Sequence, residues 1–105
     1  MRIVTNNGHP ELILEERFYL ILFSNWCEKL EAIDGVSRGK TLEDIDALWC
    51  DFIYKEVRFV LHVHQWIGDV VLLPLDDHVS YHEAEALLKE LAEKLIQNAS
   101  IQNAE

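Results

Sequence analysis

Residues 48–64, LWCDFIYKEVRFVLHVH, decide the fold because apolar residues alternate on both sides of a polar Lys-Glu pair at 55–56. If this pair is the turn of an antiparallel hairpin, Tyr54 lies opposite Val57. The same register gives one wholly apolar face, whose other cross-strand pairs are Phe52 with Phe59, Cys50 with Leu61 and Leu48 with Val63. A helix that begins after Thr41 also fits part of this pattern. Two strands that agree in register are harder to obtain by chance than one helical stripe, so the pattern predicts strands at 48–54 and 57–64.

The other face of this hairpin is mixed and supplies the candidate binding residues. It pairs Ile53 with Arg58, Asp51 with Val60, Trp49 with His62 and Ala47 with His64. Aromatic side chains beside Arg and His are typical of protein interfaces. The alternative is that the amino-terminal segment or a loop covers this side, because large aromatic side chains are usually well buried. On the first interpretation a protein partner contacts Trp49, Arg58, His62, His64 and Trp66.

The alternation of His62 and His64 also raises the question of a metal site. Alternate residues of a strand point the same way, which places the two imidazoles ~7 Å apart. His78 and His82 follow the third predicted strand, close to Asp76 and Asp77, so further ligands exist if this loop folds over. A metal needs three or four convergent ligands, and the pattern places only one pair. We therefore expect no metal or cofactor, and we keep His62, His64, His78 and His82 as the alternative metal set.

The remaining segments predict two helices and a third strand. Capping boxes at Asn25–Glu28 and Ser80–Glu83 predict helices at about 26–34 and 81–96. Residues 70–73 predict a strand that ends at Pro74 and completes an antiparallel meander. Residues 11–23 fit either a helix or a strand, and the composition of 17–23 favours a strand.

These elements predict an α+β fold in which both helices pack on the apolar face of the meander. The chain has 105 residues, half of them apolar, which suffices for one core without disulfides or a metal. The polar residues after 96 offer little to bury. We expect a single domain at 1–96 and a flexible tail at 97–105.

Charge and motifs exclude several functions. Nine basic against nineteen acidic residues give a net charge of −10, which disfavours nucleic acid and anionic membranes. The first interpretation of this acidity is that it keeps a small protein soluble, and it would also speed the encounter with a basic protein partner. Two isolated cysteines, no signal-peptide pattern and no apolar run near the ~20 residues of a membrane span indicate a cytoplasmic protein. No Gly-x-Ser-x-Gly motif occurs, and no pattern brings two carboxylates together across a cleft. We therefore expect no enzyme activity.

A set of scattered apolar positions resembles a family of small bacterial domains of unknown function. The positions lie within residues 12–96 and are Phe23, Trp26, Leu30, Trp49, Phe59 to His62 and Trp66. The resemblance implies an α+β architecture and carries no activity or functional residue. The sequence thus predicts a small acidic protein-binding module of the adaptor, chaperone or inhibitor/immunity type. Its expected partner is a protein, with a basic protein among the candidates, or a second copy of the chain. The alternative is a metal-binding or sensing domain that uses His62 and His64.

Overall fold

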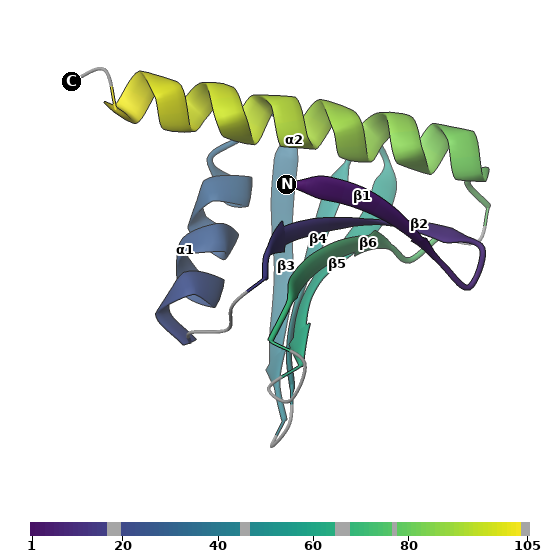
Figure 1. Ribbon diagram of the computed structural model, residues 1–105, viewed down its shortest axis with the longest axis horizontal. Helices are drawn as coiled ribbons and strands as arrows, with labels where there is room; N and C mark the ends of the chain where they lie inside the picture. Colours follow the sequence, from purple (N-terminus) through teal and green to yellow (C-terminus); the bar gives the residue numbers. More distant parts are fainter. Residues whose placement is uncertain (17–19, 45–46, 65–67, 77, 104–105) are drawn as a thin grey trace.

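The computed structural model describes residues 1–16, 20–44, 47–64, 68–76 and 78–103, which form an α+β fold (Figure 1). One sheet of six strands has the order β1-β2-β6-β5-β4-β3, and every neighbouring pair is antiparallel. In chain order the elements are β1 (Arg2–Asn6), β2 (His9–Glu15), α1 (Leu20–Glu31), β3 (Val36–Glu43), β4 (Ala47–Tyr54), β5 (Val57–His64), β6 (Val70–Pro74) and α2 (Tyr81–Asn103).

The central hairpin of β4 and β5 confirms the predicted register. Tyr54 pairs with Val57, and the other three apolar pairs form as expected, from Phe52 with Phe59 to Leu48 with Val63. The turn has only two residues, Lys55 and Glu56, and both have positive φ angles, 50° and 67°. A two-residue hairpin turn with positive φ at both positions usually contains Asn and Gly. The packing of the apolar pairs therefore holds an unfavourable turn sequence in place.

The predicted meander is confirmed for β4, β5 and β6, and the sheet extends further on both sides. At one edge β3 pairs with β4, and at the other β2 pairs with β6. No sequence pattern predicts the strands at residues 2–6 and 36–43. The β1–β2 hairpin turns at Asn7 and Gly8, with φ angles of 52° and 79°, and Asn-Gly is the residue pair that such a turn favours.

The helix α1 corrects one expectation of the sequence analysis. The strand predicted through residue 23 is wrong over residues 20–23, which are the first turn of α1, and residues 17–19 lie outside the described part. Phe23, Trp26, Cys27 and Leu30 recur at helical spacing, and all four are buried. Burial of this stripe against the sheet outweighs the strand propensity of the local sequence. The capping box at Asn25 consequently lies inside α1 rather than at its start.

Helix α2 begins at the predicted residue and ends later. Its capping box is present, since the Glu83 amide donates to the Ser80 hydroxyl over 3.2 Å. The helix continues to Asn103, whereas the sequence predicted an end near 96 followed by a tail. The side of α2 that faces the sheet is apolar, and its buried residues are Ala84, Leu88, Leu91 and Leu95. None of the described helices is long and apolar enough to cross a membrane.

A buried tyrosine ties α2 to the central hairpin. Tyr54 is 2% exposed, and its hydroxyl donates to the Glu90 carboxylate and accepts a hydrogen bond of 2.8 Å from Lys94. Lys55 in the neighbouring turn forms an ion pair of 2.7 Å with the same carboxylate. These contacts fix α2 over one face of the sheet. The core lies on that face, between the sheet and the two helices.

Candidate functional site

The face of the sheet opposite the helices carries the candidate site. Figure 1 shows α1 and α2 on the same side of the sheet. Side chains alternate along a strand, so the residues next to the core positions point to the other side. Within the described part of the chain no element lies over that side, and β1 and β2 extend the sheet instead of covering it. We call this side the open face; its residues include Val4, Glu11, Ile13, Leu42, Trp49, Asp51, Ile53, Arg58, Val60, His62, Val71 and Leu73.

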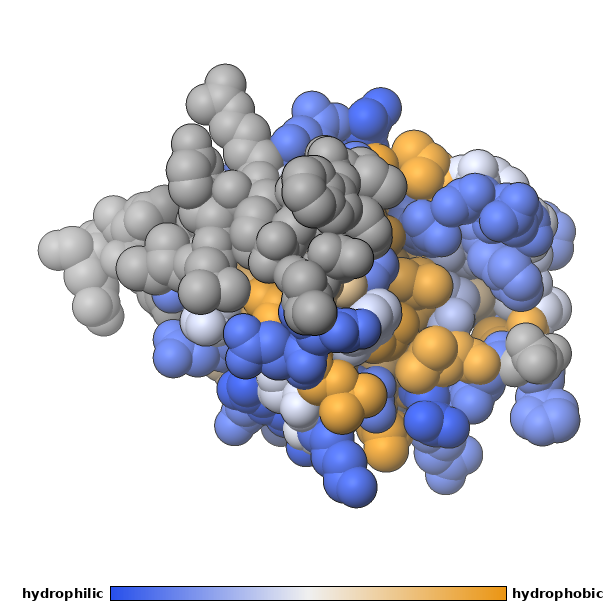
Figure 2. Space-filling view, turned by 90° about the horizontal axis from the view of Figure 1, so that it is seen from below, coloured by the Kyte–Doolittle hydropathy of each residue, from blue (hydrophilic) through white to orange (hydrophobic). Residues whose placement is uncertain are grey.

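A mostly apolar hollow occupies the β3–β6 half of the open face. Its volume is about 440 Å³, and it contains one carboxylate, that of Asp51. Leu42 and Leu75 at its border are 60% and 41% exposed. In the view from below in Figure 2, apolar side chains gather between hydrophilic ones. We call this cavity the apolar hollow; its lining residues are Leu42, Trp49, Asp51, Val60, His62, Leu73 and Leu75.

Trp49 and His62 form a fixed aromatic pair in this hollow. Their ring centroids are 5.0 Å apart with an angle of 16° between the planes, so the rings are stacked. The Nδ1 atom of His62 lies 3.3 Å from the carbonyl oxygen of Leu48, which restrains the imidazole ring. The predicted cross-strand pairing of Trp49 with His62 thus brings the two rings into contact. The pair presents a rigid aromatic surface to any molecule that enters the hollow.

A second hollow of about 450 Å³ continues the depression towards β1. It shares His62 and Leu73 with the apolar hollow, so the two are contiguous. Its lining includes two carboxylates, those of Glu11 and Asp69. The side-chain amide of Asn6 donates to the Glu11 carboxylate over 3.3 Å. We call this second cavity the acidic hollow, and the two hollows together the open-face groove.

The five predicted binding residues do not all meet in the described structure. Trp49 and His62 are in contact in the groove. Arg58 projects from the start of β5 on the same face, where its neighbour across the strands is Ile53, and its backbone amide donates to the Asp76 carboxylate over 2.9 Å. The backbone of His64 pairs with Ala47 at the far end of β5, but the side chain of His64 and the whole of Trp66 lie outside the described residues.

The sequence does not predict the residues that complete the groove. Leu73 could have been found, because strict alternation along 70–73 places it on the mixed side. Leu42 could not, since no pattern marked its strand. Glu11 and Asp69 approach the site only because β2 pairs with β6, a contact between distant parts of the sequence.

The alternative metal set is divided between two sides of the sheet. His62 lies on the open face, whereas His82 belongs to α2, which covers the other face, and packs edge to face against Tyr81. His78 precedes α2 and is exposed, and Asp77 lies outside the described residues. In the described ranges, no three His, Cys, Asp or Glu side chains gather closely enough to hold a metal ion.

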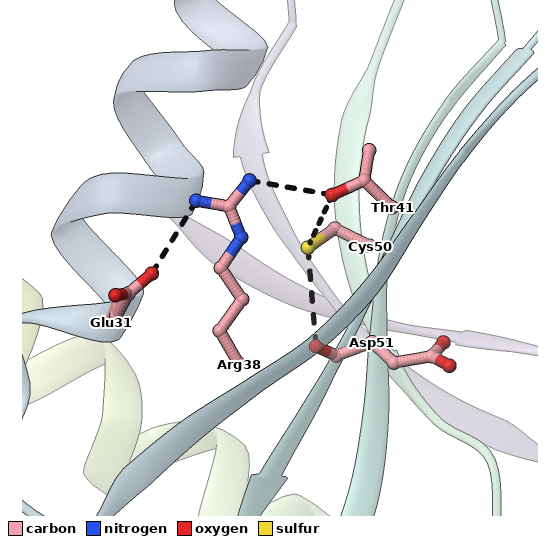
Figure 3. Close-up of polar contacts among 5 residues, drawn as sticks. All are labelled: Glu31, Arg38, Thr41, Cys50 and Asp51. Atoms are coloured by element: carbon pink, nitrogen blue, oxygen red, sulfur yellow. Dashed lines mark hydrogen bonds and ion pairs between the residues drawn. The ribbon is translucent and has the colours of Figure 1, made fainter.

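Cys27 lies on α1 and Cys50 on the helix side of β4, and both belong to the core. Figure 3 shows Cys50 beside a chain of polar contacts. Both thiols are free and buried. Arg38 donates to Glu31 and to the hydroxyl of Thr41, and that hydroxyl donates to the Sγ atom of Cys50 over 3.4 Å. Burial, with a further contribution from Cys50, raises the pKa of Cys27 to about 12. A thiol with such a pKa stays protonated at neutral pH and is a poor nucleophile.

No known protein family, curated protein or solved structure matches this chain. The resemblance to small bacterial domains therefore stays a prediction.

Proposed function

We propose that this protein is a small cytoplasmic binding module that holds a basic protein partner in the open-face groove. The observation that carries the proposal is the apolar hollow in a sheet face that no described element covers. Of the five large apolar side chains that are exposed in the described residues, three lie on or beside this face. These three are Leu42, Ile53 and Leu75. Exposed apolar side chains that gather on one face typically mark a site of interaction.

The stacked pair of Trp49 and His62 supports a role as an anchor. A ring that is already fixed loses little conformational entropy when a partner covers it. Burial of one leucine-sized partner side chain in the hollow contributes about 1.5–3 kcal/mol to binding. Tryptophan is also one of the residue types enriched among the few that dominate interface energies.

The charge of the chain supports a basic partner. The net charge is −10, and the groove itself contains the carboxylates of Asp51, Glu11 and Asp69. Such a field accelerates the association of a cationic partner and repels a second copy of the same chain. Steering by charge acts mainly on the association rate, while the buried aromatic anchor sets the dissociation rate.

The thiols support binding in the cytoplasm rather than catalysis. Cys27 and Cys50 are both free, as is usual in a reducing compartment. Their burial and the raised pKa of Cys27 leave no reactive nucleophile among the cysteines. We therefore propose a protein without enzymatic activity or cofactor, whose role as an adaptor, chaperone or inhibitor depends on contact alone.

Affinity capture with matched surface variants tests this proposal. The tagged protein is incubated with extract of its native cells, and captured proteins are compared between the wild type, Leu42→Glu with Leu75→Glu, and Ile96→Glu. Ile96 is a suitable control because it is also an exposed apolar residue, at 54%, but lies on α2.

We expect a basic partner that the wild type and Ile96→Glu retain and that the double variant loses. Circular dichroism confirms that each variant is folded. Equal capture by all three proteins, or no capture by the wild type, would overturn the proposal.

A further inference from the structure

We infer that the open-face groove receives an extended segment of the partner in which one apolar and one basic side chain lie about four residues apart. This inference rests on the proposed function and specifies the chemistry of the partner. It follows from the different linings of the two hollows and from the distance between them.

The two hollows suit different side chains. The apolar hollow offers the stacked rings of Trp49 and His62 with Leu42 and Leu75 at its border. The acidic hollow offers two carboxylates, Glu11 and Asp69, which are both half-buried. An apolar side chain gains from the first environment and a guanidinium or ammonium group from the second.

The carboxylates of the acidic hollow are available to a partner. Among the residues that the structure describes, no Lys or Arg forms an ion pair with Glu11 or Asp69. The amide of Asn6 donates one hydrogen bond to Glu11, and a carboxylate accepts several. A partly buried carboxylate forms stronger charged hydrogen bonds than a fully solvated one, so these two groups can select for a cation.

The strand order sets the spacing. The register aligns Trp49 on β4, through His62 and Val71, with Ile13 on β2, which lines the acidic hollow. Strands β5 and β6 separate β4 from β2. Three strand spacings of about 4.8 Å amount to about 14 Å across the sheet. An extended chain advances about 3.3 Å per residue, so about four residues connect the two hollows.

The size of the hollows favours an extended segment over a helix. Each has a volume of about 450 Å³ or slightly less, which accommodates one or two large side chains. A helix is 10–12 Å across and would need about nine residues to span 14 Å. The spacing of the apolar and basic residues therefore distinguishes the two modes.

Selection from a library of displayed random ten-residue peptides tests the inference directly. The wild-type protein is the bait, and bound peptides are sequenced. We expect enrichment of peptides with Arg or Lys about four positions from a large apolar residue. One enriched peptide and its version with the basic residue replaced by Gln are then synthesised as probes for fluorescence polarisation.

A charge-matched pair of variants identifies the hollow responsible. Glu11→Gln with Asp69→Asn removes two charges from the groove, and Glu28→Gln with Glu93→Gln removes two from the exposed surfaces of α1 and α2. We expect the groove variant to bind the basic peptide about tenfold more weakly than the wild type does. The Gln version of the peptide should bind both proteins alike, and the control variant should bind like the wild type.

Each other outcome is decisive. The inference would be overturned if the enriched peptides showed no preference for a basic residue, or if their apolar and basic residues lay about nine positions apart. It would also be overturned if both charge variants weakened peptide binding equally. These outcomes would leave the proposed function intact. An empty selection would overturn it too, while affinity capture still tests the proposed function. Binding that survives Leu42→Glu with Leu75→Glu would overturn both. A dimer in light scattering that the same double variant abolishes would assign the groove to a second copy of the chain.

Discussion

The two faces of the sheet are formed by the same strands, yet they differ in what they leave uncovered. On β5, Phe59, Leu61 and Val63 are fully buried beneath the helices. Their neighbour His62 is only half-buried and stacks on Trp49 in the groove. The covered face has apolar side chains in all cross-strand positions of the central hairpin, and the open face alternates apolar, aromatic and charged groups. The buried core therefore lies on the covered face, whereas the described part of the open face leaves Trp49 and His62 half-buried.

The largest expected effect tests this division on adjacent residues. Leu61→Asp buries an unpaired carboxylate in the core, which costs several kcal/mol and should unfold the domain. His62→Asp places the same group on the open face, where water solvates it, and should leave a folded protein. Thermal melts followed by circular dichroism measure both. Equal destabilisation would show that the open face also holds the fold together.

The second prediction concerns binding and leaves the covered face unchanged. Trp49→Ala removes the larger ring of the stacked pair, so the captured partner should dissociate about tenfold to a hundredfold faster. Its association rate should change little and should fall in both proteins as salt shortens the screening length to about 8 Å at physiological ionic strength. Surface plasmon resonance at two salt concentrations separates the two rates. An unchanged dissociation rate in Trp49→Ala would mean that the anchor lies outside the groove.

The sequence could predict the covered face better than the open one, for a physical reason. Burial requires apolar residues at every second position, and this requirement fixed the pairing of residues 48–54 with 57–64. The exposed strand β3 has no such requirement, and Ser37 to Glu43 carry no alternation that would reveal a strand. The β1–β2 hairpin does carry a local signal, because Asn7-Gly8 is the residue pair that its two-residue turn favours.

The groove depends on the order of strands, which local patterns do not contain. Trp49 and His62 were identified because they face each other within one hairpin. Leu42 comes from β3, and Glu11 from the amino-terminal hairpin, which inserts beside β6. Contacts between residues that lie far apart in the sequence depend on the packing of the whole sheet.

The third prediction sharpens the role of the contacts that hold α2 on the covered face. A hydrogen bond from Lys55 lowers the pKa of the Glu90 carboxylate, and the Tyr54 hydroxyl lowers it further. A lowered folded-state pKa stabilises the fold above the ordinary pKa of glutamate, and this stabilisation is lost as the pH falls through the lowered value. The difference in unfolding free energy between wild type and Glu90→Gln should therefore be larger at pH 7 than at pH 3.

Urea denaturation at the two pH values measures this difference. Glu93→Gln is the matched control, since Glu93 lies on α2 as well but has no ion pair with any described residue. Its effect should be small at both pH values. A pH-independent effect of Glu90→Gln would mean that α2 is held by its apolar side alone.

The smallest expected effect lies in the turn that joins β4 to β5. Glu56 has a φ angle of 67°, a region that costs a residue with a side chain about 1 kcal/mol and costs glycine almost nothing. Glu56→Gly gives the turn a residue suited to this conformation, although glycine also increases the entropy of the unfolded chain. The net effect should be a stabilisation of about 0.5 kcal/mol, visible as a small rise in the melting temperature.

Gly8→Ala makes the opposite change at a φ angle of 79°, and its added Cβ has open space around it, so its destabilisation reports backbone strain alone. Neither variant alters the groove, and both should bind the partner like the wild type. A loss of binding in either would mean that the open face is sensitive to the stability of the whole sheet, and the division between the two faces would fail.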